Sequence, residues 1–368
     1  MSSRLMRRLE RLPRVELHLH LEGSVSPGRL RRLWDRPGRD ADLPSDPSVL
    51  FRHRSFPEFL QHFAMVTRAL RTPGDLGAVA GDLCRSLRRQ GVVAAEVLFS
   101  PVIFTRRGLP FLEILDAVTE AAEREERRGG PAIRWILDGI RQWGVAGAEE
   151  NLECAREAGG RVVGIGMGGN EDSVPAREFS GLYAEARRLG LRTVVHAGEF
   201  GGPRSVRDAV EWLGPDRIGH GVRAMEDPGV VRLLRMEGVP LEVCPTSNLR
   251  TGVVPSWETH PLPRMAGAGL RVTLNSDDPA LFRTGLREEY RAARRRLGLS
   301  PAALYRIHRE SIRASFLPAA VRRRLLSESA RIWKGERGSR EPGLLREGAQ
   351  VSAGARGGDR RRRARARA

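Results

Sequence analysis

The stretch VELHLHLEGS, residues 15–24, places two histidines two positions apart inside an apolar run close to the N-terminus. In a β-strand, residues i and i+2 point to the same face, so His18 and His20 share one face and the intervening leucines share the other. Two imidazoles in a buried layer are destabilising unless they are bonded, and imidazole nitrogen is a favoured ligand of zinc. The pattern therefore predicts a strand that ends in part of a metal site.

Similar apolar runs, rich in Val, Ile and Leu, recur along the chain with helical patterns between them. The predicted strands are residues 15–20, 93–99, 133–138, 162–167, 192–196, 217–220, 241–244 and 271–276. Strands that alternate with helices are typical of a parallel sheet, and eight of them predict a TIM-type (β/α)8 barrel.

Helical patterns fill the intervals between these strands. The predicted helices are residues 57–70, 75–89, 112–128, 176–189, 205–213 and 228–236. Thr72-Pro73 is typical of a helix N-cap followed by proline, and Gly190 stands where a glycine often ends a helix. The interval 30–91 is too long for one crossover helix, so it predicts a helical insertion after the first strand that could cover the barrel mouth. Residues 279–337 are predicted to form further helices outside the barrel.

The organisation predicted from these patterns has three parts: a basic N-terminal segment (1–12), one barrel domain (13–337) and an Arg-rich, disordered tail (338–368). The net charge is +18, but Lys334 is the only lysine, so the arginine excess indicates a GC-rich genome more than selection for phosphate contacts. The tail could bind polyanions non-specifically. No specific nucleic-acid partner is expected.

The composition also bears on the cellular compartment. Hydrophobic residues make up 40% of the chain, yet no apolar run approaches the roughly 18 residues needed to span a bilayer. The N-terminus lacks the apolar stretch of a secretory signal. The cysteines, Cys84, Cys154 and Cys244, are odd in number and far apart, which fits no disulfide framework. We therefore expect a cytoplasmic protein without a membrane partner, and the sequence leaves the oligomeric state open.

Polar side chains stand at the carboxyl ends of the predicted strands, where barrel enzymes build their active sites. They are His18, His20, His196, His220, Asp277 and Asp278. Each element is common without a function: an HxH pair, a strand-end histidine, or an Asp-Asp-Pro turn. Their joint position at successive strand ends favours a site. Among the other histidines, His62 would contact a substrate if the insertion closed over that site.

Five segments, VELHLHLEGS, VVHAGE, RIGHGV, LEVCPTSN and NSDDP, follow one another in this order. Together they resemble the adenosine deaminase family of the metal-dependent amidohydrolase superfamily, over about residues 13–282. The resemblance implies one divalent metal ion, with zinc expected. The metal ligands that it implies are His18, His20, His196 and Asp277.

The resemblance also implies roles for other residues. Glu199 matches the proton donor, and His220 matches the histidine that orients or deprotonates the metal-activated water. Asp278 matches the carboxylate that holds the purine at N7, and Gly169 matches a backbone contact to the purine ring. His20 is also expected near the substrate.

The chemistry of hydrolytic deamination is consistent with these roles. A metal lowers the pKa of its bound water to about 7, and attack on C6 of a 6-aminopurine moves negative charge to N1. An acid such as Glu199 at N1 would neutralise that charge before ammonia leaves. Relatives with two metals use a lysine at the end of the fourth strand, but residues 166–169 are Gly-Met-Gly-Gly. One metal ion is therefore expected.

The substrate is less clearly defined by the sequence. Adenosine enzymes carry an aspartate that contacts the ribose 5′ hydroxyl where this chain has Glu22, and GNE (169–171) replaces their GDE. The segment RWILDGIRQWG (134–144) most resembles the aminodeoxyfutalosine deaminases of a menaquinone route, whose nucleoside substrate carries a 5′ benzoate extension. An arginine at the pocket mouth could pair with that carboxylate.

The expected activity is thus deamination of a purine nucleoside, either adenosine or aminodeoxyfutalosine, with adenine as an alternative. An alternative of another class is a metal-dependent phosphoesterase, since HxH pairs also occur in such sites. A polyanion-binding protein that uses the Arg-rich tail is a non-enzymatic alternative.

Overall fold

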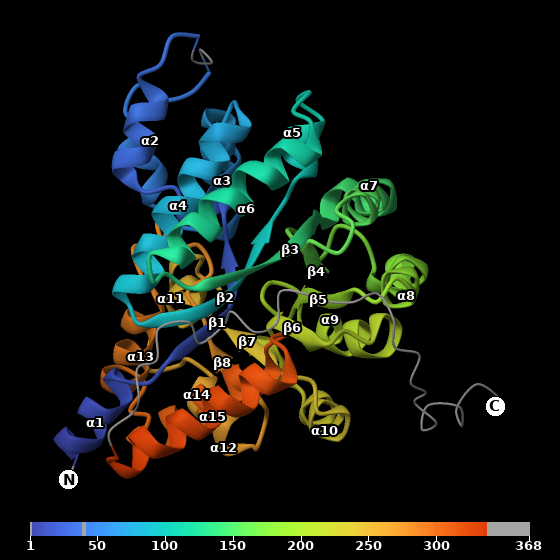
Figure 1. Ribbon diagram of the computed structural model, residues 1–368. Helices are drawn as coiled ribbons and strands as arrows, with labels where there is room; N and C mark the ends of the chain where they lie inside the picture. Colours follow the sequence, from blue (N-terminus) through green and yellow to red (C-terminus); the bar gives the residue numbers. More distant parts are fainter. Residues whose placement is uncertain (1, 39–41, 337–368) are drawn as a thin grey trace.

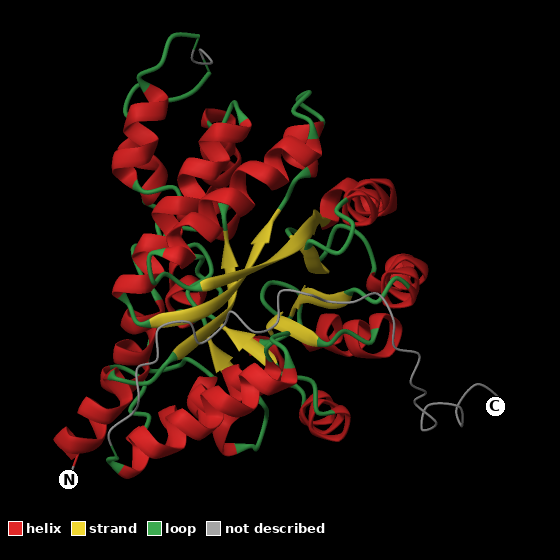
Figure 2. Cartoon of the chain, viewed as in Figure 1, coloured by secondary structure: helices red, strands yellow, loops and turns green. Residues whose placement is uncertain are grey.

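The computed structural model describes residues 2–38 and 42–336, and the predicted tail (338–368) lies outside them. A barrel of parallel strands, arranged in sequence order, is surrounded by helices (Figures 1 and 2). The strands are β1 (Arg14–His20), β2 (Val92–Phe99), β3 (Ala132–Ile140), β4 (Val162–Gly168), β5 (Arg192–Ala197), β6 (Arg217–His220), β7 (Leu241–Val243) and β8 (Val272–Leu274). The (β/α)8 prediction is confirmed, with strand ends within two residues of those expected.

The seam between β1 and β8 closes the barrel at the level of the predicted site. Leu19 forms a parallel bridge with Asp277. The His20 N–H donates to the Asp277 carbonyl at 2.8 Å, and the Asp277 N–H donates to the His18 carbonyl at 3.1 Å. Barrel closure itself therefore places the histidine pair beside Asp277.

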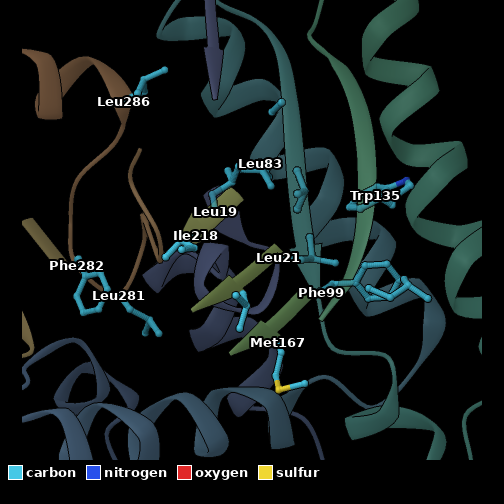
Figure 3. Close-up of a cluster of buried hydrophobic side chains, with 14 of the residues drawn as sticks. Leu19, Leu21, Leu83, Phe99, Trp135, Met167, Ile218, Leu281, Phe282 and Leu286 are labelled. Atoms are coloured by element: carbon cyan, nitrogen blue, oxygen red, sulfur yellow. The ribbon is translucent and has the colours of Figure 1, made fainter. Parts of the chain in front are cut away.

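The core reflects the period of two that the opening stretch shows. Leu19 and Leu21 are fully buried on the outer face of β1. They lie with Leu83 of α4 (Pro73–Arg89) and with Phe99 and Trp135 of β2 and β3 in the apolar cluster drawn in Figure 3. The leucines thus hold the strand against its helices, while the histidines face inward.

Helices connect the strands and cover the barrel. The remaining α-helices are α1 (Ser2–Glu10), α2 (Pro27–Trp34), α3 (Phe56–Ala69), α5 (Val102–Thr105), α6 (Phe111–Arg127), α7 (Gly144–Glu157), α8 (Ser180–Arg188), α9 (Pro203–Asp208), α10 (Pro228–Glu237), α11 (Pro245–Arg250), α12 (Leu262–Gly267), α13 (Leu286–Arg295), α14 (Pro301–Ala314) and α15 (Ala319–Lys334). Every predicted helix is present. The expected helix 176–189 begins as a 3-10 turn, η4 (Ala176–Phe179), and 205–213 ends in a π-helical turn, η5 (Ala209–Leu213). Thr72 caps α4 in a capping box with Asp75.

The predicted insertion after β1 contains η1 (Glu22–Ser24), α2, η2 (Pro47–Phe51) and α3. Side chains of α3 line the same cavity as the strand-end residues. Ser55 caps this helix by accepting the Glu58 N–H, and Pro57 stands in its first turn. The insertion therefore covers the barrel mouth, as expected.

The C-terminal helices α14 and α15 pack against the outer face of the barrel, as predicted. Ile312 of α14 and Leu317 after it pack against Val15 and Leu17 of β1. The basic segment 1–12, for which no helix was predicted, contains α1, and Arg8 in it donates to the Trp333 carbonyl of α15 at 2.8 Å. Within the described ranges, no helix is long and apolar enough to cross a membrane.

Candidate active site

The strand-end side chains converge on one buried point inside the barrel mouth. One ligand atom from each of His18, His196, His220 and Asp277 lies within 4.8 Å of the others. His20 stands at the edge of this group, and its Nε2 lies 3.4 Å from Asp277 Oδ1, as does Nε2 of His18. The structure thus brings together all four predicted metal ligands and the predicted catalytic histidine.

Two of the imidazole rings are held by bonds at their other nitrogen. His18 Nδ1 lies 2.8 Å from Glu242 Oε2, and His196 Nδ1 lies 3.1 Å from the Met167 carbonyl oxygen. An Nδ1–H that donates to an oxygen leaves Nε2 as a lone pair for a cation. In His18, Nε2 is buried and faces Asp277 Oδ1 at 3.4 Å.

The third ring lies beside a carboxyl group that the sequence did not single out. Asp138 lies in the carboxyl-terminal part of β3, is buried, and places Oδ2 3.7 Å from His20 Nδ1. A Cβ atom at Gly166 or Gly168 would lie 2.6 or 3.0 Å from the Asp138 carboxyl oxygens. The two glycines of β4 therefore make room for Asp138.

A buried ionic network lies under the site. Glu242 also accepts from Arg217, which pairs with Glu96 at 2.7 Å and lies over the Phe316 ring at 3.6 Å. All three charged side chains are almost completely buried. A charge inside an apolar strand has to be paired, and this rule was the sequence signal for a network that the predictions missed.

The ligand atoms of this group and the charges around them fit a metal ion. The Asp277 carboxyl is buried, yet bonds and charges from the surrounding histidines hold its pKa well below the usual range. Burial alone would lower the pKa of His18, but its bonds to Asp277 and Glu242 raise it to about 10. The site thus favours positive charge, and imidazole nitrogens with a carboxylate form a typical set of zinc ligands.

Two residues of the site, His220 and Asp277, have strained backbone conformations that orient their side chains. His220 and Asp277 have positive φ angles of 60° and 64°, which cost about 1–3 kcal/mol each for residues other than glycine. Two glycines give the space: a Cβ at Gly219 would lie 2.8 Å from the His18 ring, and one at Gly23 would lie 1.7 Å from Asp278 Oδ1. The glycine of HLEG is therefore required by Asp278.

Glu199 and His220 face each other across the site, with Oε2 and Nε2 3.5 Å apart. Burial, followed by the charges of Asp277 and Glu171, raises the pKa of Glu199 well above its usual value, which favours the protonated carboxyl group. Burial lowers the pKa of His220 to about 3, so the ring is neutral. The Asn248 amide contacts His220 Nδ1 at 3.2 Å and fixes the ring orientation.

The cavity above these groups has a volume of about 230 Å³ and two contrasting halves. Its floor is polar: His20, Asp138, Gly168, Gly169, His196, Glu199, His220, Asp277 and Asp278. Its roof is largely apolar: Phe56, Phe59, Leu60, Phe63, Ile103, Ile140 and Trp143. Among the described residues that line the cavity there is no arginine, so none of them could pair there with the carboxylate of a ligand.

Two residues expected near the substrate do not line the cavity. Glu22 is fully buried, and its Oε1 accepts the Ser100 N–H at 2.8 Å. Ser100, in contrast, is one of the lining residues. His62 places its Nδ1 3.1 Å from His53 Nδ1 and is also outside the lining.

A parallel barrel with a histidine and aspartate cluster at its carboxyl end defines a metal-dependent hydrolase of the amidohydrolase type. The sequence profile described as adenosine deaminase matches residues 13–332. The chain belongs to the adenosine deaminase family, whose members are hydrolytic deaminases.

Individual relatives support this assignment. The chain is 38% identical over 323 residues to an aminodeoxyfutalosine deaminase of Streptomyces avermitilis, with 86% of this chain and 90% of the relative covered. It is 35% identical over 315 residues to an adenine deaminase of Mesorhizobium japonicum, with 85% and 97% covered. Among solved structures, it is similar to a zinc-bound amidohydrolase of Burkholderia ambifaria, with a TM-score of 0.83, 26% identity, and 91% and 94% covered. Together with the buried cluster, this likeness indicates that the site holds a metal ion.

Proposed function

We propose that this enzyme removes the 6-amino group of a purine nucleoside that carries an aromatic group at its 5′ position, with aminodeoxyfutalosine as the substrate. The observation that carries the choice is the aromatic roof of the cavity, which Phe59 and Phe63 of α3 share with Trp143 after β3. Free adenine would fill the polar floor and leave these rings without a partner. An aromatic 5′ extension would stack against them.

One zinc ion is the proposed metal, held by His18, His20, His196 and Asp277. When bound, zinc lowers the pKa of a coordinated water to about 7. A second metal bridged by lysine is not expected, because β4 ends in Gly168 and Lys334 ends α15, outside the barrel.

The remaining groups handle the purine and its protons. Glu199, whose raised pKa favours the protonated form, donates to ring N1 as water adds at C6, and neutral His220 accepts a proton from that water. The buried Asp278 Oδ1 lacks a partner and lines the cavity, where it binds N7. Burial and the charge of Asp277 raise the pKa of Asp278 well above the usual range, which favours the protonated form that can donate to N7.

The carboxylate of the 5′ benzoate lies at the solvent side of the roof, since no lining arginine pairs with it among the described residues. Adenine remains the second candidate, because adenine deaminases stand among the relatives. The phosphoesterase alternative receives no support from the relatives or from the site.

The test compares deamination rates of zinc-loaded enzyme with aminodeoxyfutalosine, 5′-methylthioadenosine, adenosine and adenine, followed by loss of the 6-amino chromophore. We expect kcat/KM to decrease in that order. The matched variant Phe63→Ala should lower kcat/KM for aminodeoxyfutalosine by roughly tenfold and leave adenine almost unaffected. A preference for adenine, or an equal loss for both substrates, would contradict the proposal.

A further inference from the structure

The loop that carries Glu199 is held by a single buried carboxylate, Glu171, which ends the segment GNE after β4. Its Oε2 accepts the Gly198 N–H at 2.7 Å, and its Oε1 accepts the N–H groups of Glu199 and Phe200, both at 2.8 Å. The Ser205 hydroxyl, at the start of α9, donates to the same carboxylate. One side chain thus receives four donors from residues 198–205.

These bonds fix the backbone on both sides of Glu199. Three consecutive N–H groups converge on Glu171, and Gly198 has the positive φ of 69° that such a concave loop needs. A Cβ at Gly201 would lie 2.7 Å from Glu171 Oε2, so this position must stay small. Hydrogen bonds to a charged acceptor are stronger than neutral ones, so the loop is rigid where Glu199 leaves it.

The far side of the loop is held by a different element. Arg223 donates to the Phe200 carbonyl at 2.6 Å, and its own N–H donates to the Gly198 carbonyl at 2.9 Å. The Phe200 ring stacks on Phe56 of the insertion at a centroid distance of 4.4 Å. The loop therefore lies between β4, β6 and the roof, and Glu171 holds its inner side.

We propose that Glu171 is a positioning residue: by accepting these four hydrogen bonds, it holds the Glu199 carboxyl group at the distance from the purine that proton transfer to N1 requires. Glu171 does not line the cavity, so we expect no direct contact between it and the substrate. The inference rests on the role proposed above for Glu199. The negative charge of Glu171 also helps to keep a proton on Glu199, because it raises the pKa of that group after burial and Asp277.

The test is a double-mutant cycle with Glu171→Gln and Glu199→Gln in the zinc-loaded enzyme. In Glu171→Gln an amide NH2 replaces one accepting oxygen and faces an N–H donor. A misplacement of about 1 Å can cost on the order of 100-fold in rate, so kcat should fall by about that factor while KM changes by less than about threefold. In the Glu199→Gln background, Glu171→Gln should reduce the residual kcat by less than about threefold, since its effect acts through Glu199.

Two milder variants and a control complete the design. Ser205→Ala removes one donor of the four, and Glu171→Asp keeps the charge but shortens the side chain. Both should retain more activity than Glu171→Gln, and they serve as the test if that variant does not fold. Asp172→Asn removes the neighbouring exposed charge and should leave kcat unchanged.

The outcomes distinguish the two proposals. Additive losses in the cycle, or an unchanged kcat in Glu171→Gln, would overturn the positioning role and leave the proposed function intact. A wild-type kcat in Glu199→Gln would overturn both. Zinc content and thermal unfolding are measured for every variant. Only variants that match the wild type in both are compared in kcat.

Discussion

Glu242→Gln is the change that most directly tests how the buried network supports the metal site. The substitution keeps the size and shape of the side chain but removes the charge that accepts from His18 Nδ1 at 2.8 Å and from Arg217. Burial raises the pKa of Glu242, but the charge of Arg217 and the bond from His18 outweigh it and lower the pKa, so the wild-type group is ionised at neutral pH. The glutamine amide can turn an oxygen to only one of these two donors.

The expected magnitudes follow from those contacts. Loss of a carboxylate behind a metal-ligating histidine lowers metal affinity by about 10- to 100-fold, or about 1.4–2.7 kcal/mol. Breaking a buried ion pair destabilises the fold by about 3–5 kcal/mol, and the lower part of that range applies because Arg217 keeps Glu96 and the Ala314 carbonyl as acceptors. Metal affinity and folding stability should therefore both decrease.

Zinc affinity is measured by competition with a chromophoric chelator, and stability by urea unfolding of the metal-free protein. The control is Glu289→Gln, another fully buried carboxyl, which accepts the Thr246 N–H at 3.1 Å and contacts no histidine. It should lose stability without losing zinc affinity. If Glu242→Gln bound zinc as tightly as the wild type, Glu242 would have no role in orienting His18, and the inference from the 2.8 Å contact would be wrong.

Two further predictions concern other parts of the chain. Gly23→Ala places a Cβ 1.7 Å from Asp278 Oδ1. Because the carboxyl group has to move by roughly 1 Å or more, kcat/KM should fall about 100-fold, with little change in zinc content. A variant with wild-type kinetics would show that Asp278 does not bind substrate. Burial lowers the pKa of His308 from 6.5 to about 3. Between these two pH values the unfolded chain binds a proton that the folded chain does not. The free energy of unfolding should therefore decrease as the pH falls through this window. Unfolding by urea at several pH values should show a flatter dependence in His308→Asn, and an unchanged slope would contradict that origin.

Much of the fold could be predicted because its signals are local. Each strand is a short apolar run, and the helix start at Thr72 has its capping residues adjacent in sequence. Helix α7 (Gly144–Glu157) was not predicted, since its glycines and small residues weaken the apolar period. Gly147 has a structural reason, because a Cβ there would lie 2.7 Å from the Trp143 side chain.

The metal ligands were predictable for a different reason. His18, His196 and Asp277 lie at or just beyond the carboxyl ends of their strands, and in a parallel barrel all these ends meet at one face. The residues that support them, such as Glu242 and Glu171, act through contacts with strands and loops far away in sequence. A charged residue inside an apolar run shows that some partner must exist. The partner can be identified only when the pairing register of the barrel strands is known.

The residues that choose the substrate were the hardest to predict, and the position of Glu22 shows why. The sequence assigned substrate choice to this residue because it differs from the aspartate of adenosine enzymes. Its carboxyl instead bonds the Ser100 N–H, so any influence on the substrate passes through Ser100 and the start of α5. The rings of Phe59 and Phe63, which line the cavity, belong to an amphipathic helix, where apolar residues cannot be told from ordinary core. Specificity is therefore best sought in the inserted helix, where a substitution would change the cavity without disturbing the strand ends that carry the proposed metal ligands.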